Sequence, residues 1–104
     1  MNIDQVDAIC LSLNGARRQD LLGPGIRCWT VEGRIFATMA DNSEQIALRC
    51  QDEKVAQLLV DHARAGMLPR LPQGCWVALD LSIGAYELHC RIIESYEMVR
   101  ADGA

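Results

Sequence analysis

Basic residues are scarce in this sequence of 104 residues, where ten Lys and Arg stand against fourteen Asp and Glu and leave a formal net charge of -4. This balance excludes a polybasic protein that coats nucleic acid or lies on a membrane surface, but it permits a local basic face. No apolar run approaches the roughly 18 residues that a membrane-spanning helix needs. Half of the residues are apolar and 23% are charged, as in ordinary globular proteins. We therefore expect one compact domain over residues 1–104.

Paired cysteine motifs are also missing. The five cysteines are odd in number, lie about twenty residues apart and nowhere form C-x-x-C, so neither zinc sites nor thioredoxin-like motifs are indicated. Residues 1–5 have neither the cationic region nor the apolar stretch of an export signal. We expect a cytoplasmic protein with reduced thiols, no metal and no cofactor, in which most cysteines are small buried hydrophobes. The cysteines are Cys10, Cys28, Cys50, Cys75 and Cys90.

Motifs that carry known catalytic chemistry are absent as well. The sequence contains no G-x-S-x-G, G-x-G-x-x-G, P-loop or H-E-x-x-H pattern. His89 precedes Cys90 in a predicted helix, but neighbouring helix residues point about 100° apart and do not form a nucleophile–base pair. His62 lies at the edge of an apolar helix face, where a structural imidazole is expected. We therefore do not expect an enzyme.

Apolar periodicity predicts three helices and four strands. The first helix covers residues 2–13 and begins with a capping box of Asn2 and Gln5, and residues 15–26 are expected to be an irregular crossing. Helices flank the strands instead of alternating with them, so the predicted class is α+β, in the order helix, three strands, helix, strand, helix. We expect a largely antiparallel sheet with helices on one face. The strands are expected over 28–31, 34–39, 45–50 and 75–81, and a loop is expected over 66–74. The two later helices are expected to begin at Asp52 and at Ser82. The last helix is expected to bury Leu88, Ile92, Tyr96 and Val99.

The pair Glu32-Gly33 predicts a two-residue hairpin turn, which sets the register of its strands. The predicted partners are Val31 with Arg34, Trp29 with Phe36, and Arg27 with Thr38. These six residues then share one face, and we expect the smaller, apolar set on the opposite face to lie under the helices. That second set is Cys28, Thr30, Ile35, Ala37 and Met39.

The uncovered face is expected to combine aromatic rings with arginines. By the same alternation Arg49 lies opposite to Leu48 and Cys50, and Trp76 opposite to Cys75 and Val77. Aromatic planes can stack on bases while guanidinium groups bind phosphates. The same side chains also suit packing, with arginine stems covering the rings. The candidate nucleic-acid-binding residues on this face are Arg27, Trp29, Arg34, Phe36, Arg49 and Trp76.

Four short segments occur in a recognisable order between residues 27 and 99. They are the hairpin Trp29–Ala37 (aromatic-x-Val-x-Gly-Arg-apolar-Phe-Ala), the strand and acidic helix start Leu48–Glu53, the Trp-containing strand Trp76–Leu81, and the closing Ser-Tyr-x-x-Val of Ser95–Val99. Together they resemble the MmcQ/YjbR-like family of small bacterial proteins.

The resemblance implies a compact α+β domain related in topology to frataxin-like folds. It also implies a DNA-binding role, attributed in the family to two projecting wing-like elements, with no reaction or cofactor. Many relatives carry clustered His, Asn, Lys and Arg just before the Trp of the fourth strand, whereas residues 66–74 keep one charge here, Arg70. Because each lost phosphate contact lowers affinity, we expect weak, largely non-specific DNA binding to which Arg70 also contributes.

The alternative is a protein-interaction or small-ligand module with no nucleic-acid role. It would use the surface of the three aromatic residues or the loop before the fourth strand. Apolar side chains on an exposed loop suit an apolar partner or a second copy of the chain. In that loop they are Met67, Leu68 and Leu71.

Overall fold

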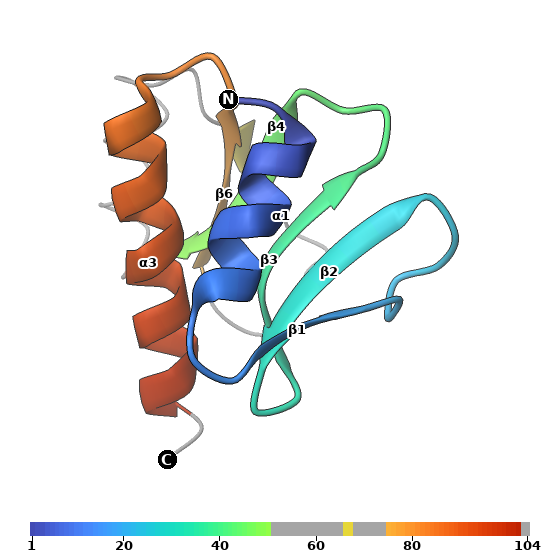
Figure 1. Ribbon diagram of the computed structural model, residues 1–104, viewed down its shortest axis with the longest axis vertical. Helices are drawn as coiled ribbons and strands as arrows, with labels where there is room; N and C mark the ends of the chain where they lie inside the picture. Colours follow the sequence, from blue (N-terminus) through green and yellow to red (C-terminus); the bar gives the residue numbers. More distant parts are fainter. Residues whose placement is uncertain (51–65, 68–74, 103–104) are drawn as a thin grey trace.

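Six antiparallel strands make one sheet, and both of the helices in the described residues lie against the same face of it (Figure 1). The computed structural model describes residues 1–50, 66–67 and 75–102. The strands neighbour one another in the order β1-β2-β3-β4-β6-β5. Along the chain the elements are α1 (Ile3–Ser12), β1 (Ala16–Gln19), β2 (Ile26–Val31), β3 (Arg34–Ala40), β4 (Gln45–Cys50), β5 (Gly66–Met67), β6 (Cys75–Asp80) and α3 (Ala85–Asp102).

The predicted α+β class is confirmed, and two strands were missed. Ala16–Gln19, expected to be irregular, pairs with β2 as an edge strand, and three of its four residues are exposed. The strand was missed because its residues are polar on both faces, so the sequence shows no alternation of apolar and polar residues there. Gly66–Met67, expected within a loop, pairs with β6. The helix predicted from Asp52 lies outside the described residues.

The first helix begins as predicted. The Asn2 side chain accepts a hydrogen bond from the Gln5 backbone N–H (2.9 Å), and the Gln5 side chain accepts one from the Asn2 N–H (2.8 Å), which completes the capping box. Val6 and Cys10 face the sheet and are fully buried. Local side-chain chemistry therefore fixes where α1 starts.

The last helix begins later than predicted. Gly84 accepts the hydrogen bond of the Leu88 N–H (3.0 Å), whereas the Ser82 N–H bonds to the Asp80 side chain (2.8 Å) in the turn before the helix. Ser82 is therefore not the cap, and the helix continues to Asp102. The predicted buried face is confirmed, since four residues of α3 belong to the main core: Leu88, Ile92, Tyr96 and Val99.

The hairpin between β2 and β3 contains the predicted turn and an unpredicted β-bulge. Glu32 and Gly33 have φ values of 53° and 78°, as a two-residue turn of this hand requires. Val31 pairs with Arg34 as predicted, but the register shifts beyond Thr30, and Trp29 pairs with Ala37. Phe36 is the bulged residue of β3, which has no partner of its own in β2. The predicted pairs Trp29–Phe36 and Arg27–Thr38 are therefore wrong, since Arg27 pairs with Met39 and Thr38 with Cys28.

The predicted assignment of the two sheet faces is also wrong. Trp29 and Phe36 share a face, as expected, but it is the face under the helices, where both are fully buried. The Phe36 ring meets the Tyr96 ring of α3 edge-on, with centroids 5.5 Å apart and planes at 81°. Large rings fill the space between sheet and helices. The opposite face holds a second, smaller cluster of Cys28, Ile35, Ala47 and Trp76.

Ser95 of α3 joins the helix to the sheet at the bulge. Strands β3 and β4 pair up to Ala37 and Leu48, and the next ladder position would join Phe36 to Arg49. There the Arg49 backbone N–H donates to Ser95 Oγ (2.9 Å), and the Ser95 hydroxyl donates to the Phe36 carbonyl (2.5 Å). The hydroxyl thus takes the place of a ladder hydrogen bond. Because Ser95 is fully buried, water cannot easily replace it.

Replacing Ser95 with Ala is expected to destabilise the protein by about 2–4 kcal/mol, because a buried N–H and a buried carbonyl both lose their partner. Urea unfolding followed by circular dichroism measures this loss. Ser12→Ala is the matched control, since the exposed Ser12 hydroxyl bonds only to the Ile9 carbonyl of its own helix and its loss is expected to cost under about 0.5 kcal/mol. Equal effects of the two substitutions would contradict the bridging role of Ser95.

Candidate nucleic-acid interface

The three candidate aromatic residues offer no ring to a nucleic-acid base. Trp29 and Phe36 are 0% exposed and Trp76 is 3% exposed. Trp76 lies on the opposite sheet face from the other two, so the three rings do not form one platform. The predicted stacking surface is therefore wrong. The prediction failed because it placed Trp29 and Phe36 on the uncovered sheet face. In the structure they belong to the core under the helices, and Trp76 belongs to the smaller cluster on the other face.

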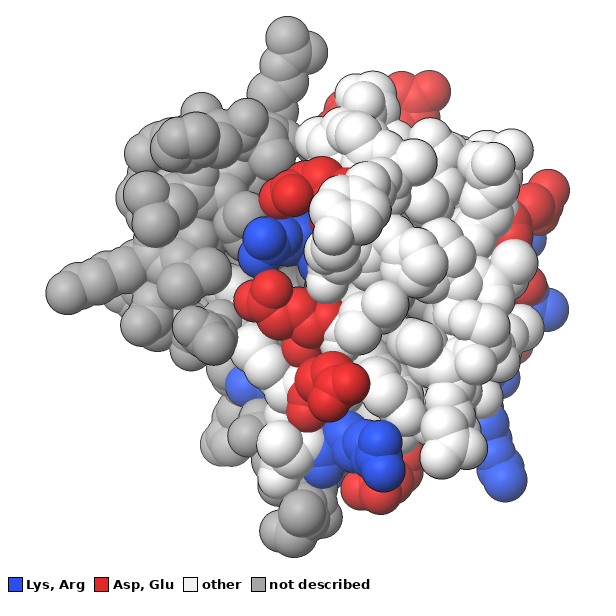
Figure 2. All heavy atoms as spheres, turned by 60° about the vertical axis from the view of Figure 1, so that its left-hand side comes forward, with Lys and Arg blue, Asp and Glu red and all other residues white. Residues whose placement is uncertain are grey.

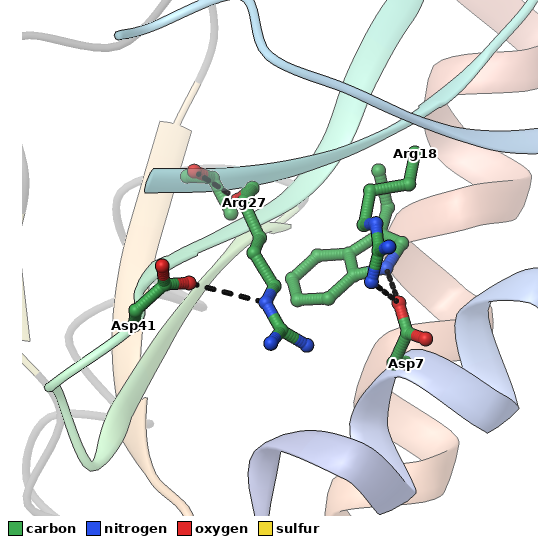
Figure 3. A network of polar contacts seen from close by, with 6 residues as sticks. Asp7, Arg18, Arg27 and Asp41 are labelled. Atoms are coloured by element: carbon green, nitrogen blue, oxygen red, sulfur yellow. Dashed lines mark hydrogen bonds and ion pairs between the residues drawn. The ribbon is translucent and has the colours of Figure 1, made fainter. Parts of the chain in front are cut away.

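Trp29 also has a polar anchor, which the sequence did not indicate. Its indole N–H donates to Asp7 of α1 (2.9 Å), and the same carboxylate oxygen accepts a hydrogen bond from Arg18 of β1 (3.1 Å). Figure 3 shows the Arg18–Asp7 contact at the junction of α1 and the sheet edge. Asp7 therefore ties a helix to two strands, which is a structural role.

Arg27 lies apart from the other candidate arginines. Its guanidinium forms an ion pair with Asp41 (3.1 Å; Figure 3). The depression beside it is also lined by Arg18 and Asp20, so cationic and anionic groups alternate there. This mixture of charges does not favour a phosphate, and Arg27 is not part of the candidate interface.

Arg34, Arg49 and Trp76 do come together, as predicted from their strands. They line an open depression of about 440 Å³ at the end of the sheet that carries the β2–β3 turn. Arg49 and Trp76 are direct cross-strand partners, which places both on the face opposite to the helices. No Asp or Glu is among the described residues that line this hollow, which we call the arginine depression: Leu21, Gly33, Arg34, Ile35, Arg49, Trp76 and Val99.

Arg17 is a further basic residue that the prediction missed. It is exposed on β1, directly opposite Thr30, and lines a second hollow that meets the arginine depression at Gly33. Glu32 lines this second hollow too, and its carboxylate partly offsets the charge of Arg17. The adjacent arginines 17 and 18 were the only signal, and they fell in a segment expected to be irregular. Arg70 lies outside the described residues.

Acidic side chains gather on the opposite layer of the molecule. Figure 2, with α3 turned toward the viewer, shows a band of acidic residues down this side. Arg91 offsets part of the band through ion pairs with Glu87 (3.2 Å) and Glu94 (3.0 Å). Because the band follows α3, it lies on the helical side of the sheet. The face that holds Arg49 and Trp76 is turned the other way.

The described residues contain no cluster of three or more His, Cys, Asp or Glu side chains that could hold a metal ion. None of the helices in the described part of the chain is both long and apolar enough to cross a membrane.

A sequence model of the YjbR family matches residues 11–98. The chain belongs to the YjbR family. The match includes three of the four segments on which the predicted resemblance rests and all but Val99 of the fourth, and it confirms that resemblance. The structure is also similar to the crystal structure of Deinococcus radiodurans protein DR2400, a DUF419 domain, with a TM-score of 0.82 and 18% identity over 99% of this chain and 81% of that one. At this identity the likeness shows a shared fold. No curated protein matches the chain.

The thiols of this YjbR protein include one that is strongly held in its neutral form. Cys10, Cys28, Cys50 and Cys90 are reduced in the described structure. Burial against the sheet raises the pKa of the Cys10 thiol well above its usual value of 9.0, and the negative charge of Asp7 raises it further. Thiolates, not thiols, act as nucleophiles. Cys10 is therefore a core residue.

The raised pKa of Cys10 predicts a loss of stability in alkali. Above pH 9.0 the unfolded chain releases this proton while the folded protein keeps it, so the free energy of unfolding falls by up to about 1.4 kcal/mol per pH unit. Urea unfolding between about pH 8 and about pH 10 measures the slope. Cys10→Ala is expected to show a shallower slope, whereas Cys90→Ala is expected to keep that of the wild type. Indistinguishable slopes in all three proteins would contradict the assignment.

Proposed function

We propose that this protein binds DNA weakly and without strong sequence preference, through Arg34 and Arg49 of the arginine depression together with the neighbouring Arg17. The observation that carries the proposal is the depression itself, where two arginines from different strands line one hollow. Membership of the YjbR family supports it, because the predicted resemblance implies a DNA-binding role. The proposal assigns no reaction, metal or cofactor to the chain.

The proposed contacts are to phosphate groups, not to bases. Guanidinium groups form paired, charge-assisted hydrogen bonds with phosphate oxygens. Stacking on bases would need an exposed ring, and Trp76 in the floor of the depression is 3% exposed. Phosphate contacts position a protein on nucleic acid but carry no sequence information directly. Low sequence preference follows from the burial of the aromatic residues.

The charge of the whole molecule limits the affinity. The net charge of -4 repels a polyanion, and the acidic residues of α3 contribute to that repulsion. Three phosphate contacts against this background correspond to a dissociation constant in the micromolar range or weaker at physiological salt, on the order of 10⁻⁶–10⁻⁴ M.

An apolar partner is the second candidate, and one observation favours it. Leu21 and Leu22 are exposed (53% and 41%) in the segment after β1, and Leu21 lines the arginine depression. Exposed leucines beside a hollow suit a protein or small-molecule ligand. The sequence predicted two surfaces for such a partner. The aromatic surface is not available at Trp29 and Phe36, because both are buried. In the predicted loop, residues 68–72 lie outside the described residues.

The decisive experiment is a salt titration of binding to a fluorescent DNA duplex, followed by anisotropy. Three phosphate contacts predict a slope of log affinity against log salt of about -2.7, at roughly 0.9 per contact. Arg34→Ala, Arg49→Ala and Arg17→Ala are each expected to weaken binding to all duplexes alike and to flatten the slope by about one unit.

Arg91→Ala is the matched control for this titration. It removes the same charge from the acidic side of the molecule, where Arg91 pairs with Glu87 and Glu94, and is expected to leave the slope unchanged. Retained affinity in the triple variant of Arg17, Arg34 and Arg49 would rule out this interface. Absence of binding to any duplex at low salt would reject DNA and favour the apolar partner.

A further inference from the structure

We propose that Cys50 and Cys75 form a redox modification site, at which two thiols of neighbouring strands join in a reversible disulfide. Cys50 is the last residue of β4 and Cys75 the first residue of β6, and the two are direct partners in the antiparallel ladder. The proposal is independent of the DNA binding proposed above, because it rests on strand register alone.

The register gives the distances that a disulfide needs. Opposite residues of antiparallel strands have Cα atoms about 4.5–5.5 Å apart, and disulfides join Cα atoms about 4.4–6.8 Å apart. In antiparallel sheets in general, directly opposite positions have Cβ atoms about 4.5–5.5 Å apart, whereas a disulfide needs about 3.5–4.5 Å. Closure of the link therefore requires a slight approach of the two strands. The two residues stand at the open end of the ladder, where a strand gives way most easily.

The described register gives Cys50 a cysteine partner and gives Cys28 none. Cys28 stands opposite Thr38 and Gln19, with its Sγ 3.6 Å from the Thr38 hydroxyl. Cys10 and Cys90 belong to the two helices, and the Cys10 thiol is held protonated by burial. A disulfide at the Cys50–Cys75 position adds one bond between strands that are already paired. It leaves the order and the register of the strands unchanged.

The reaction consumes a small-molecule disulfide as its oxidant, of which oxidised glutathione is the probe. The thiolate of one cysteine attacks the glutathione disulfide, forms a mixed disulfide and releases one glutathione thiol. The thiolate of the second cysteine then attacks the protein sulfur of that mixed disulfide and releases the second glutathione thiol. Two protein thiols are oxidised and one glutathione disulfide is reduced to two thiols. Excess reduced glutathione reverses both steps.

Access to the site requires a local opening of the strand ends. Cys50 is 3% exposed, so a glutathione disulfide reaches it only when the last ladder pair separates. Terminal pairs of a sheet open far more often than the whole protein unfolds. We therefore expect oxidation over a period that is long compared with modification of the more exposed Cys90, but without global unfolding.

The test equilibrates the native protein with glutathione buffers of increasing oxidised fraction, stops exchange with acid, and counts thiols after denaturation. The link is expected to remove two of the five thiols of the wild type, beyond any thiol of Cys90 that carries glutathione and shows as added mass, and peptide mapping is expected to find one intramolecular link between Cys50 and Cys75. Reduced glutathione in excess is expected to restore all five. Cys90→Ser is expected to form the same link, which separates the site from the more exposed thiol.

Two variants trap the intermediate. In Cys50→Ser and in Cys75→Ser the link cannot close, so the remaining cysteine of the pair keeps its thiol or carries one glutathione, which is visible as added mass. Circular dichroism confirms that each variant is folded before it is used. Absence of the Cys50–Cys75 link from the peptide map of the wild type at every buffer composition would overturn the proposal. So would a link that joins any other pair of cysteines.

Discussion

The hydroxyl of Ser95 stands where a helix, a β-bulge and two strands meet, and the arrangement of both sheet faces depends on this contact. The bulge at Phe36 leaves a carbonyl of β3 without its ladder partner, and Ser95 supplies the missing connection to the backbone of Arg49. The same contact seats α3 on the sheet. Next to this contact the Tyr96 ring of α3 packs against Phe36.

Features that depend on a few consecutive residues could be predicted. The capping box of α1, the Glu32-Gly33 turn and the buried face of α3 each follow from side chains within one or two turns of chain, and all three are confirmed. The bulge could not be predicted, because its stabilising partner lies 59 residues away at Ser95. The edge strand β1 was not predicted, for a different reason. Its polar sequence carries no periodicity, and it becomes a strand only by pairing with β2.

The positions of the candidate residues on the sheet were predicted in part, and the main error has one physical origin. In a strand the side chains alternate between faces, so a wrong choice of the covered face moves a whole set of residues to the other side. For this reason Trp29 and Phe36 were predicted on the uncovered face, whereas they lie in the core under the helices. Arg49 and Trp76 were placed correctly because β4 and β6 pair without a bulge. Arg27 was predicted to bind phosphate, but it forms an ion pair with Asp41. This partner comes from a loop, whose position periodicity does not predict.

The two arginines of β1 have a second consequence, which concerns self-association. β1 is an edge strand of the described sheet, and an exposed edge offers its backbone groups to the edge of any other sheet it meets. Positive charge on a short edge strand opposes such pairing, because two copies that approach edge to edge bring like charges together. Arg17 therefore opposes edge-to-edge pairing of separate copies at high concentration, and Arg18 contributes less because Asp7 offsets its charge. A chain that lost both would be more prone to form aggregates, whatever its affinity for a ligand.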